Sequence, residues 1–136
     1  INYRQMHQRA LKEIEDNHSD PLKRLQAFAD LFSCTLGDDF RMCPCGVLCI
    51  DSSRISAVIK QEVQAFISNS EAWLAGVLRD GANAGIFNIN GNINDCARML
   101  FASFEGAMLS ARAFQDKQRL TRSLRQTIRM LQNHHD

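Results

Sequence analysis

The stretch that decides the fold is residues 93–114, INDCARMLFASFEGAMLSARAF, because as a helix it is apolar on nearly every side. At roughly 100° per residue, its large side chains gather on one side and its small ones on the other. The large side consists of Ala97, Leu100, Phe101, Phe104, Met108 and Ala111, and the small side of Ala102, Ser103, Gly106, Leu109, Ser110 and Ala113. A helix with two apolar sides needs packing partners on both, so this segment predicts a helical bundle.

Helical patterns continue on either side of this segment. Downstream, residues 117–131 carry a single apolar stripe, and Asp116 is the expected N-cap. Upstream, a long amphipathic pattern begins at Ser53 and stops at Gly81 or Gly85. The residue Asn92 lies where an N-cap of the central segment is expected.

Two further patterns lie near the beginning of the chain. Residues 1–17 form a one-sided amphipathic helix, and a second helix runs from an N-cap at Asp20 through Pro21 to Gly37. A short helical piece is also expected around Val47, Leu48 and Ile50. The sequence therefore predicts an all-α protein, an antiparallel bundle of five or six helices that forms one domain over residues 1–136.

The composition supports this class and excludes several others. The chain has 136 residues, of which 45% are hydrophobic, and its two prolines and lack of alternating strand patterns argue against sandwiches, barrels and disorder. The formal net charge of +1 does not suit a nucleic-acid-binding module. There is no membrane-length apolar run and no leader pattern, and the cysteine count is odd, so we expect a cytoplasmic protein without a membrane contact and with reduced thiols.

Two partners could cover the small side of the central helix: residues 117–131 of the same chain, or a second copy of the chain. A bundle this thin does not easily cover both sides by itself, so we favour a two-fold homodimer in which residues 93–114 and 117–131 meet their copies. The expected interface consists of Ala102, Ser103, Gly106, Leu109, Ser110, Ala113, Leu120, Leu124, Ile128 and Leu131.

Large apolar residues from three helices are expected to converge beside the large side of the central helix. They either form plain core or line a cavity that suits a small hydrophobic ligand. The candidate ligand-binding residues are Phe28, Phe66, Trp73, Leu100, Phe101, Phe104 and Met108. Glu62, Arg98 and Glu105 would add polar contacts if they turned inward, and are otherwise charges in solvent.

Three phrases of the sequence resemble the C-terminal domain of TetR/AcrR-family transcription regulators: Cys43-Pro-Cys-Gly-Val-Leu-Cys-Ile-Asp51, Gly85-Ile-Phe and Phe104-Glu-Gly-Ala-Met-Leu-Ser-Ala-Arg112. The resemblance implies a ligand-responsive regulator, a repressor, whose domain binds a small effector among its central helices and dimerises through its last two helices. It further implies that residues 1–17 connect to an N-terminal helix-turn-helix domain that this sequence lacks, and that DNA is contacted only through that domain.

A cysteine cluster supports a different function. Cys43, Cys45 and Cys49 follow Arg41, and an accessible thiol in a positively charged setting could sense oxidants or electrophiles. The alternatives are packed thiols or a zinc site, although Cys-x-Cys is not the usual spacing for zinc. Cys34 and Cys96, which lie in apolar helical patterns, are expected to be packing residues.

Signs of an enzyme are weak. The pair Glu15-x-x-His18 matches half of a di-iron motif of helical bundles, which leaves a metal-dependent enzyme as an alternative, but no second copy of the motif is present. No nucleophile elbow or phosphate loop occurs, so we expect no catalysis, no metal and no cofactor.

The last helix has a basic face that either lies in solvent or contacts nucleic acid or anionic lipid. Its members are Lys117, Arg119, Arg122, Arg125 and Arg129.

Overall fold

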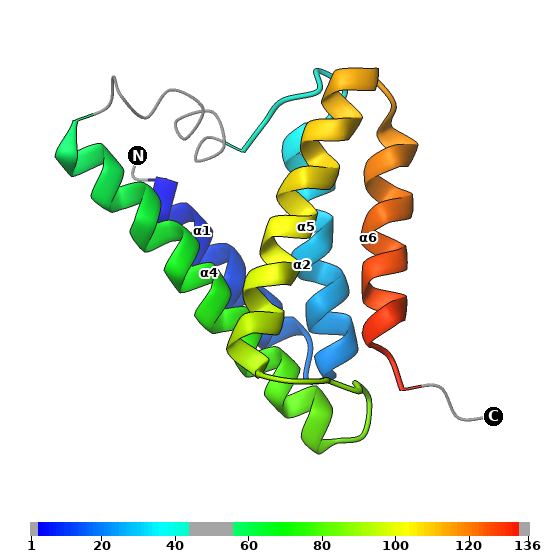
Figure 1. Ribbon diagram of the computed structural model, residues 1–136. Coiled ribbons are helices and arrows are strands. Elements are labelled where there is room, and N and C mark those ends of the chain that lie inside the picture. Colours follow the sequence, from blue (N-terminus) through cyan, green and yellow to red (C-terminus); the bar gives the residue numbers. More distant parts are fainter. Residues whose placement is uncertain (1–2, 44–55, 134–136) are drawn as a thin grey trace.

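The computed structural model describes residues 3–43 and 56–133, and within them the chain forms five α-helices (Figure 1). This confirms the expected all-α class. The short helical piece expected around residues 47–50 lies outside the described residues. The helices are α1 (Tyr3–Asn17), α2 (Pro21–Leu36), α4 (Ala57–Asn83), α5 (Ile93–Phe114) and α6 (Lys117–Leu131).

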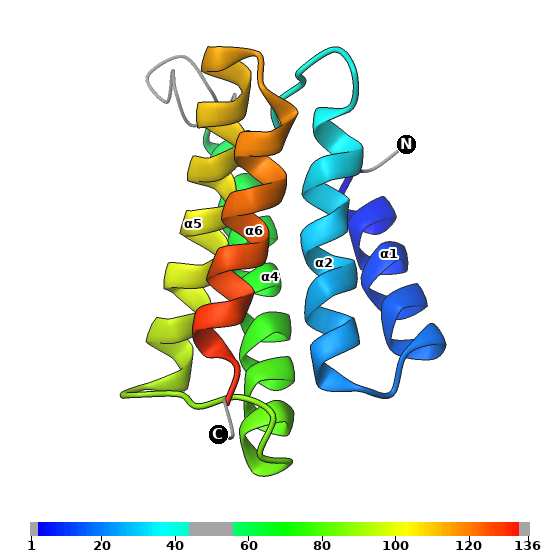
Figure 2. The ribbon, with the colours of Figure 1, turned by 90° about the vertical axis from the view of Figure 1, so that its right-hand side faces the viewer.

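Successive helices run in opposite directions, and the bundle is built around α5 (Figures 1 and 2). The helices α4 and α6 both pack against α5, and α2 contacts α4, α5 and α6. The first helix, α1, packs against α2 and runs parallel to α4 along the outside of the bundle. The first helix is therefore at the periphery, and the middle of the bundle consists of α2, α4 and α5.

Side-chain caps define where three helices begin, as the sequence predicts. An Asp20 carboxylate oxygen accepts a hydrogen bond from the backbone N–H of Leu22 at 2.9 Å, at the start of α2. The side chain of Asn92 caps α5 with a 3.1 Å hydrogen bond, and that of Asp116 caps α6 with one of 3.0 Å. These bonds satisfy backbone donors that a helix leaves unpaired at its N-terminus.

The long helix α4 does not stop at Gly81 but continues to Asn83, two residues before Gly85. Gly81 is buried, and a Cβ atom at this position would collide with the ring of Phe87. The glycine therefore serves close packing rather than helix termination. The chain after α4 is also tied to the end of α6, because the Asn88 N–H donates to the Leu131 carbonyl at 2.8 Å.

The two sides of α5 have opposite surroundings. All six residues of the large side are buried, which confirms that this side belongs to the core. All six residues of the small side are exposed in the single chain. The alternative in which residues 117–131 cover the small side is therefore wrong, because α6 packs along one flank of α5 and leaves that side open. The stripe of α6 lies inside the subunit; its residues are Leu120, Leu124, Ile128 and Leu131.

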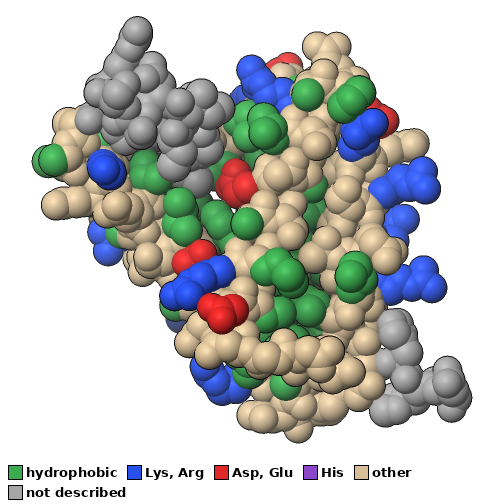
Figure 3. All heavy atoms as spheres, in the orientation of Figure 1, with side chains coloured by type: hydrophobic (Ala, Val, Ile, Leu, Met, Phe, Trp, Pro, Cys, Tyr) green, Lys and Arg blue, Asp and Glu red, His purple; other side chains and the backbone are tan. Residues whose placement is uncertain are grey.

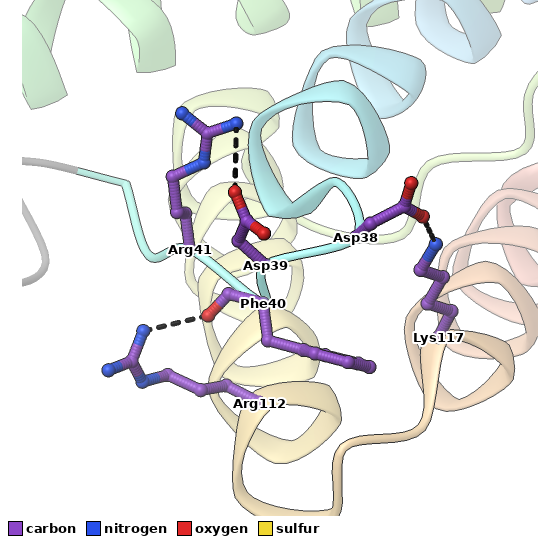
Figure 4. Close-up of polar contacts among 6 residues, drawn as sticks. All are labelled: Asp38, Asp39, Phe40, Arg41, Arg112 and Lys117. Carbon is purple, nitrogen blue, oxygen red and sulfur yellow. Dashed lines mark hydrogen bonds and ion pairs between the residues drawn. The ribbon is translucent and has the colours of Figure 1, made fainter.

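Polar contacts hold the turn after α2 to the corner between α5 and α6 (Figure 4). Arg112 donates a 2.7 Å hydrogen bond to the carbonyl oxygen of Phe40, and Lys117 pairs with Asp38. The Lys117 ammonium group lowers the pKa of the Asp38 carboxyl. This corner positions the segment that leads to Cys43, which forms part of the site described next.

Candidate functional site

A small cavity lies where α1 crosses the aromatic core formed by α2, α4 and α5. Its volume is about 40 Å³, enough for no more than a few water molecules. Five aromatic rings form most of its wall, with a few polar groups between them. The lining residues are Tyr3, His7, Phe28, Leu31, Phe32, Thr35, Cys43, Phe66, Phe101, Glu105 and Met108.

Four of the seven candidate ligand-binding residues line this cavity: Phe28, Phe66, Phe101 and Met108. The other three are placed behind its wall.

Trp73 stacks on Phe28, with 5.4 Å between the ring centroids, and its indole N–H donates to the Glu15 carboxylate at 2.7 Å. Phe104 supports the ring of Phe32 edge-on at 5.4 Å, and Leu100 is fully buried. Trp73 and Phe104 therefore support the wall without lining it, and Leu100 belongs to the core.

The cavity also contains residues that the sequence did not identify as a site. Tyr3 and His7 come from the first helix, and their rings lie 5.3 and 4.4 Å from that of Phe66. They stand one turn apart and continue into the buried Leu11 and Ile14, so these residues form the inward face of α1. A stripe drawn from the apolar residues of this helix alone also includes Met6, which is 52% exposed.

His7 is the polar centre of the cavity wall. Its Nε2 atom lies 3.0 Å from the hydroxyl oxygen of Ser70, which is fully buried on α4. The Ser70 hydroxyl donates its hydrogen to the Phe66 carbonyl at 2.9 Å, so the histidine N–H donates to the serine oxygen. Burial lowers the pKa of His7, and a neutral imidazole is therefore favoured at neutral pH.

The half-buried histidine predicts a loss of stability in mild acid. The unfolded chain takes up a proton as the pH falls through the ordinary histidine pKa of about 6.5, whereas the folded chain resists protonation because its pKa is lower. The free energy of unfolding should therefore decrease from pH 7 downward, and His7→Gln should lessen this decrease. Urea unfolding at several pH values measures it, and equal pH dependence in both proteins would contradict the assignment.

The described part of the cysteine cluster does not have the setting that a reactive thiol needs. Cys43 is only 5% exposed, and its sulfur lies 3.7 Å from the Tyr3 hydroxyl. Arg41 pairs with Asp39 at 3.7 Å. The other two cysteines of the cluster, Cys45 and Cys49, lie outside the described residues, so the sensor hypothesis remains a prediction for them. Separately, the expectation that Cys34 is a packing residue is wrong, because its side chain is exposed, whereas Cys96 is partly buried and packs against the core as expected.

Of the three charged residues that could add polar contacts to a ligand, one lines the cavity and two lie at the surface. Glu105 lines the cavity, whereas Glu62 forms a surface ion pair with Arg4 at 3.6 Å and Arg98 forms one with Asp95 at 3.0 Å.

Neither a metal site nor a membrane-spanning helix is found among the described residues. Within residues 3–43 and 56–133, no group of three or more His, Cys, Asp or Glu side chains is arranged to hold a metal ion. None of the helices described there combines the length and the apolar character needed to cross a membrane.

The small side of α5 forms the second candidate site, a surface (Figure 3). Leu109 on this side is 51% exposed, and Met99, which lies one turn before Ser103 on the same face of the helix, is 55% exposed. At Gly106 a Cβ atom would meet no other atom within 4 Å, so the helix backbone is open to close approach. Hydrophobic side chains follow α5 in Figure 3, and Lys and Arg side chains project from the outer edge of α6. We call this apolar side of α5 the outer α5 face.

Comparisons with known proteins agree with this architecture. Residues 21–127 match the family described as tetracyclin repressor-like, C-terminal domain. A TetR-family transcriptional regulator from Agrobacterium tumefaciens superposes with a TM-score of 0.90 at 29% sequence identity, over 96% of this chain and 70% of that one. The regulatory protein TetR from Rhodobacter sphaeroides has the same fold, with a TM-score of 0.83 at 19% identity over 95% of this chain and 70% of its own. No curated protein matches the sequence.

Proposed function

This chain belongs to the TetR family of regulators, and on that premise we propose that it is the effector-binding and dimerisation half of a cytoplasmic, ligand-responsive transcriptional repressor. The observation that carries the proposal is the division of α5 into one side that faces the cavity and core and another that is apolar and exposed. In this proposal α1 connects to a DNA-binding domain, and the chain has no catalytic role.

The outer α5 face supports homodimerisation. Its small residues let the backbone of another helix approach closely, and burial of Met99 and Leu109 supplies apolar contact area. A stable dimer buries roughly 800 Å² on each partner, which two neighbouring helices can provide together. Because the apolar stripe of α6 is buried, the part of α6 that reaches the partner is its exposed edge beside α5. Ser123 and Met130 are exposed on this helix.

The cavity supports binding of a small, mostly apolar effector. Its aromatic walls favour a flat or hydrophobic molecule, and His7 and Glu105 provide polar contacts. Ligand pockets usually measure about 300–1,000 Å³, so an effector requires this cavity of about 40 Å³ to expand. The wall that yields most easily is α1, because it lies at the periphery with Leu11 and Ile14 as its buried residues.

Movement of α1 would connect the effector to DNA binding. Three polar contacts hold this helix to α4: Arg4 to Glu62 at 3.6 Å, His7 to Ser70 at 3.0 Å and Glu15 to Trp73 at 2.7 Å. An effector that displaces Tyr3 and His7 weakens the first two contacts. The equilibrium between two positions of α1 then shifts in each subunit of the dimer. The DNA-binding domain that α1 would carry changes its position with it.

A matched pair of tryptophan variants tests the cavity. Leu31→Trp places a large ring at the cavity wall, whereas Leu22→Trp makes the same change on α2 at another half-buried position that does not line it. With 2-naphthol as the probe, calorimetry should give saturable binding to the unmodified chain and to Leu22→Trp. Leu31→Trp should raise the Kd at least about tenfold, because the new ring fills the space. Equal affinity in the two variants would show that the probe binds elsewhere.

A further inference from the structure

The helices α2 and α6 lie side by side in Figure 2, and a second hollow lies between them. Its volume is about 430 Å³, roughly ten times that of the cavity beside α1. Ala29 on α2 faces Leu124 and Ile128 on α6 across it, and the small side chain of Ala29 leaves the space open. These three residues are 3–6% exposed and form an apolar floor. We call this hollow the α2–α6 groove.

The rim of the groove is positively charged on the α6 side. Arg125 and Arg129 stand one helical turn apart at its edge, and α6 contains no acidic residue over residues 117–131. Two other cations of the helix are engaged elsewhere: Lys117 pairs with Asp38, and the Arg119 guanidinium lies 3.7 Å from the centre of the Phe114 ring.

The opposite rim carries a single acid, Asp30 on α2. It forms no ion pair with Arg125 within 4 Å in the part of the chain that the structure describes. The rim thus carries two guanidinium groups and one carboxylate, with the positive groups together on α6.

We propose that the α2–α6 groove binds a small amphiphilic carboxylate, such as a medium-chain fatty acid. The carboxylate head pairs with Arg125, for which the planar guanidinium offers two parallel hydrogen bonds, and Arg129 adds a second positive charge. The hydrocarbon chain lies on the apolar floor, away from Asp30. A neutral molecule would leave the Arg125 guanidinium without an anionic group to pair with, and a DNA backbone would make no use of a concave apolar floor. This site is separate from the proposed effector cavity and does not depend on it.

Decanoate is a suitable probe, and the charge of α6 offers a matched control. Arg125→Glu reverses the charge at the groove, whereas Arg122→Glu reverses it on the same helix at a residue outside the groove. Calorimetry on the whole chain should show saturable binding of decanoate. Arg125→Glu should weaken this binding at least about tenfold, the effect expected from loss of a hydrogen bond to a charged group, and Arg122→Glu should leave it within about twofold. Decanol, which has no charge, should bind at least about tenfold more weakly than decanoate.

Two further variants locate the bound molecule independently of charge. Thr121→Trp places a ring at the exposed edge of the groove and should also weaken decanoate binding, whereas Leu31→Trp at the α1 cavity should not. Circular dichroism establishes that each variant is folded. The proposal is overturned if decanoate shows no saturable binding, if decanol binds equally well, if both charge reversals have the same effect, or if Leu31→Trp is the variant that abolishes binding.

Discussion

Replacing Gly106 with arginine is expected to convert the proposed dimer into a monomer. Gly106 lies on the outer α5 face, and a Cβ atom there meets nothing within 4 Å of the single chain. An arginine can therefore be accommodated by the subunit but not by a second helix packed closely against this position, where it would also bury an unpaired charge. Light scattering after gel filtration should give the mass of one chain, 15.4 kDa, instead of twice that mass.

The matched control is Gly76→Arg on α4, the same substitution at another helical glycine with no atom near its Cβ position. Both changes favour the isolated helix by about 1 kcal/mol, because glycine is a poor helix former. The control should remain dimeric. If both variants dissociate, or neither does, the outer α5 face is not the interface.

The largest expected loss of stability follows from Phe104→Ala. Phe104 is fully buried and supports Phe28 and Phe32, with ring centroids 6.2 and 5.4 Å away. Removing it leaves a space beneath the two rings that line the proposed effector cavity, and the free energy of unfolding should fall by about 3–5 kcal/mol. Urea denaturation measures this value.

The same substitution at Phe114 provides the comparison, because this residue lies on the same helix but is 65% exposed. Its loss removes a contact with Arg119 and should cost about 1 kcal/mol or less. Introducing both changes into the Gly106→Arg background removes any contribution from subunit association. Similar losses at Phe104 and Phe114 would contradict the described core.

Much of the fold could be predicted because it depends on local patterns. The sides of α5 follow from helical periodicity, and all six residues of its large side are buried. The N-caps Asp20, Asn92 and Asp116 follow from residue type and position, and all three make the expected hydrogen bonds.

Features that depend on distant contacts could not be predicted in this way. Gly81 resembles a helix stop until Phe87 is seen packed on it. His7 counts as polar in a hydrophobic pattern, and its inward orientation depends on Ser70, which is 63 residues away in the sequence.

The α6 stripe illustrates a different limit. Periodicity identifies Leu124 and Ile128 as buried, but it does not say whether the same chain or a second copy buries them. In the structure the subunit itself buries them, and they form the floor of the α2–α6 groove. The candidate interface therefore loses the apolar stripe of α6 and keeps its other predicted part, the outer α5 face.

Sedimentation velocity of the unmodified chain tests the central claim most directly: α5 packs one side into its own subunit and the other against a second copy. Across micromolar concentrations we expect one compact species with twice the mass of the 15.4 kDa chain. A compact monomer at every concentration would leave the outer α5 face in water and would contradict the account.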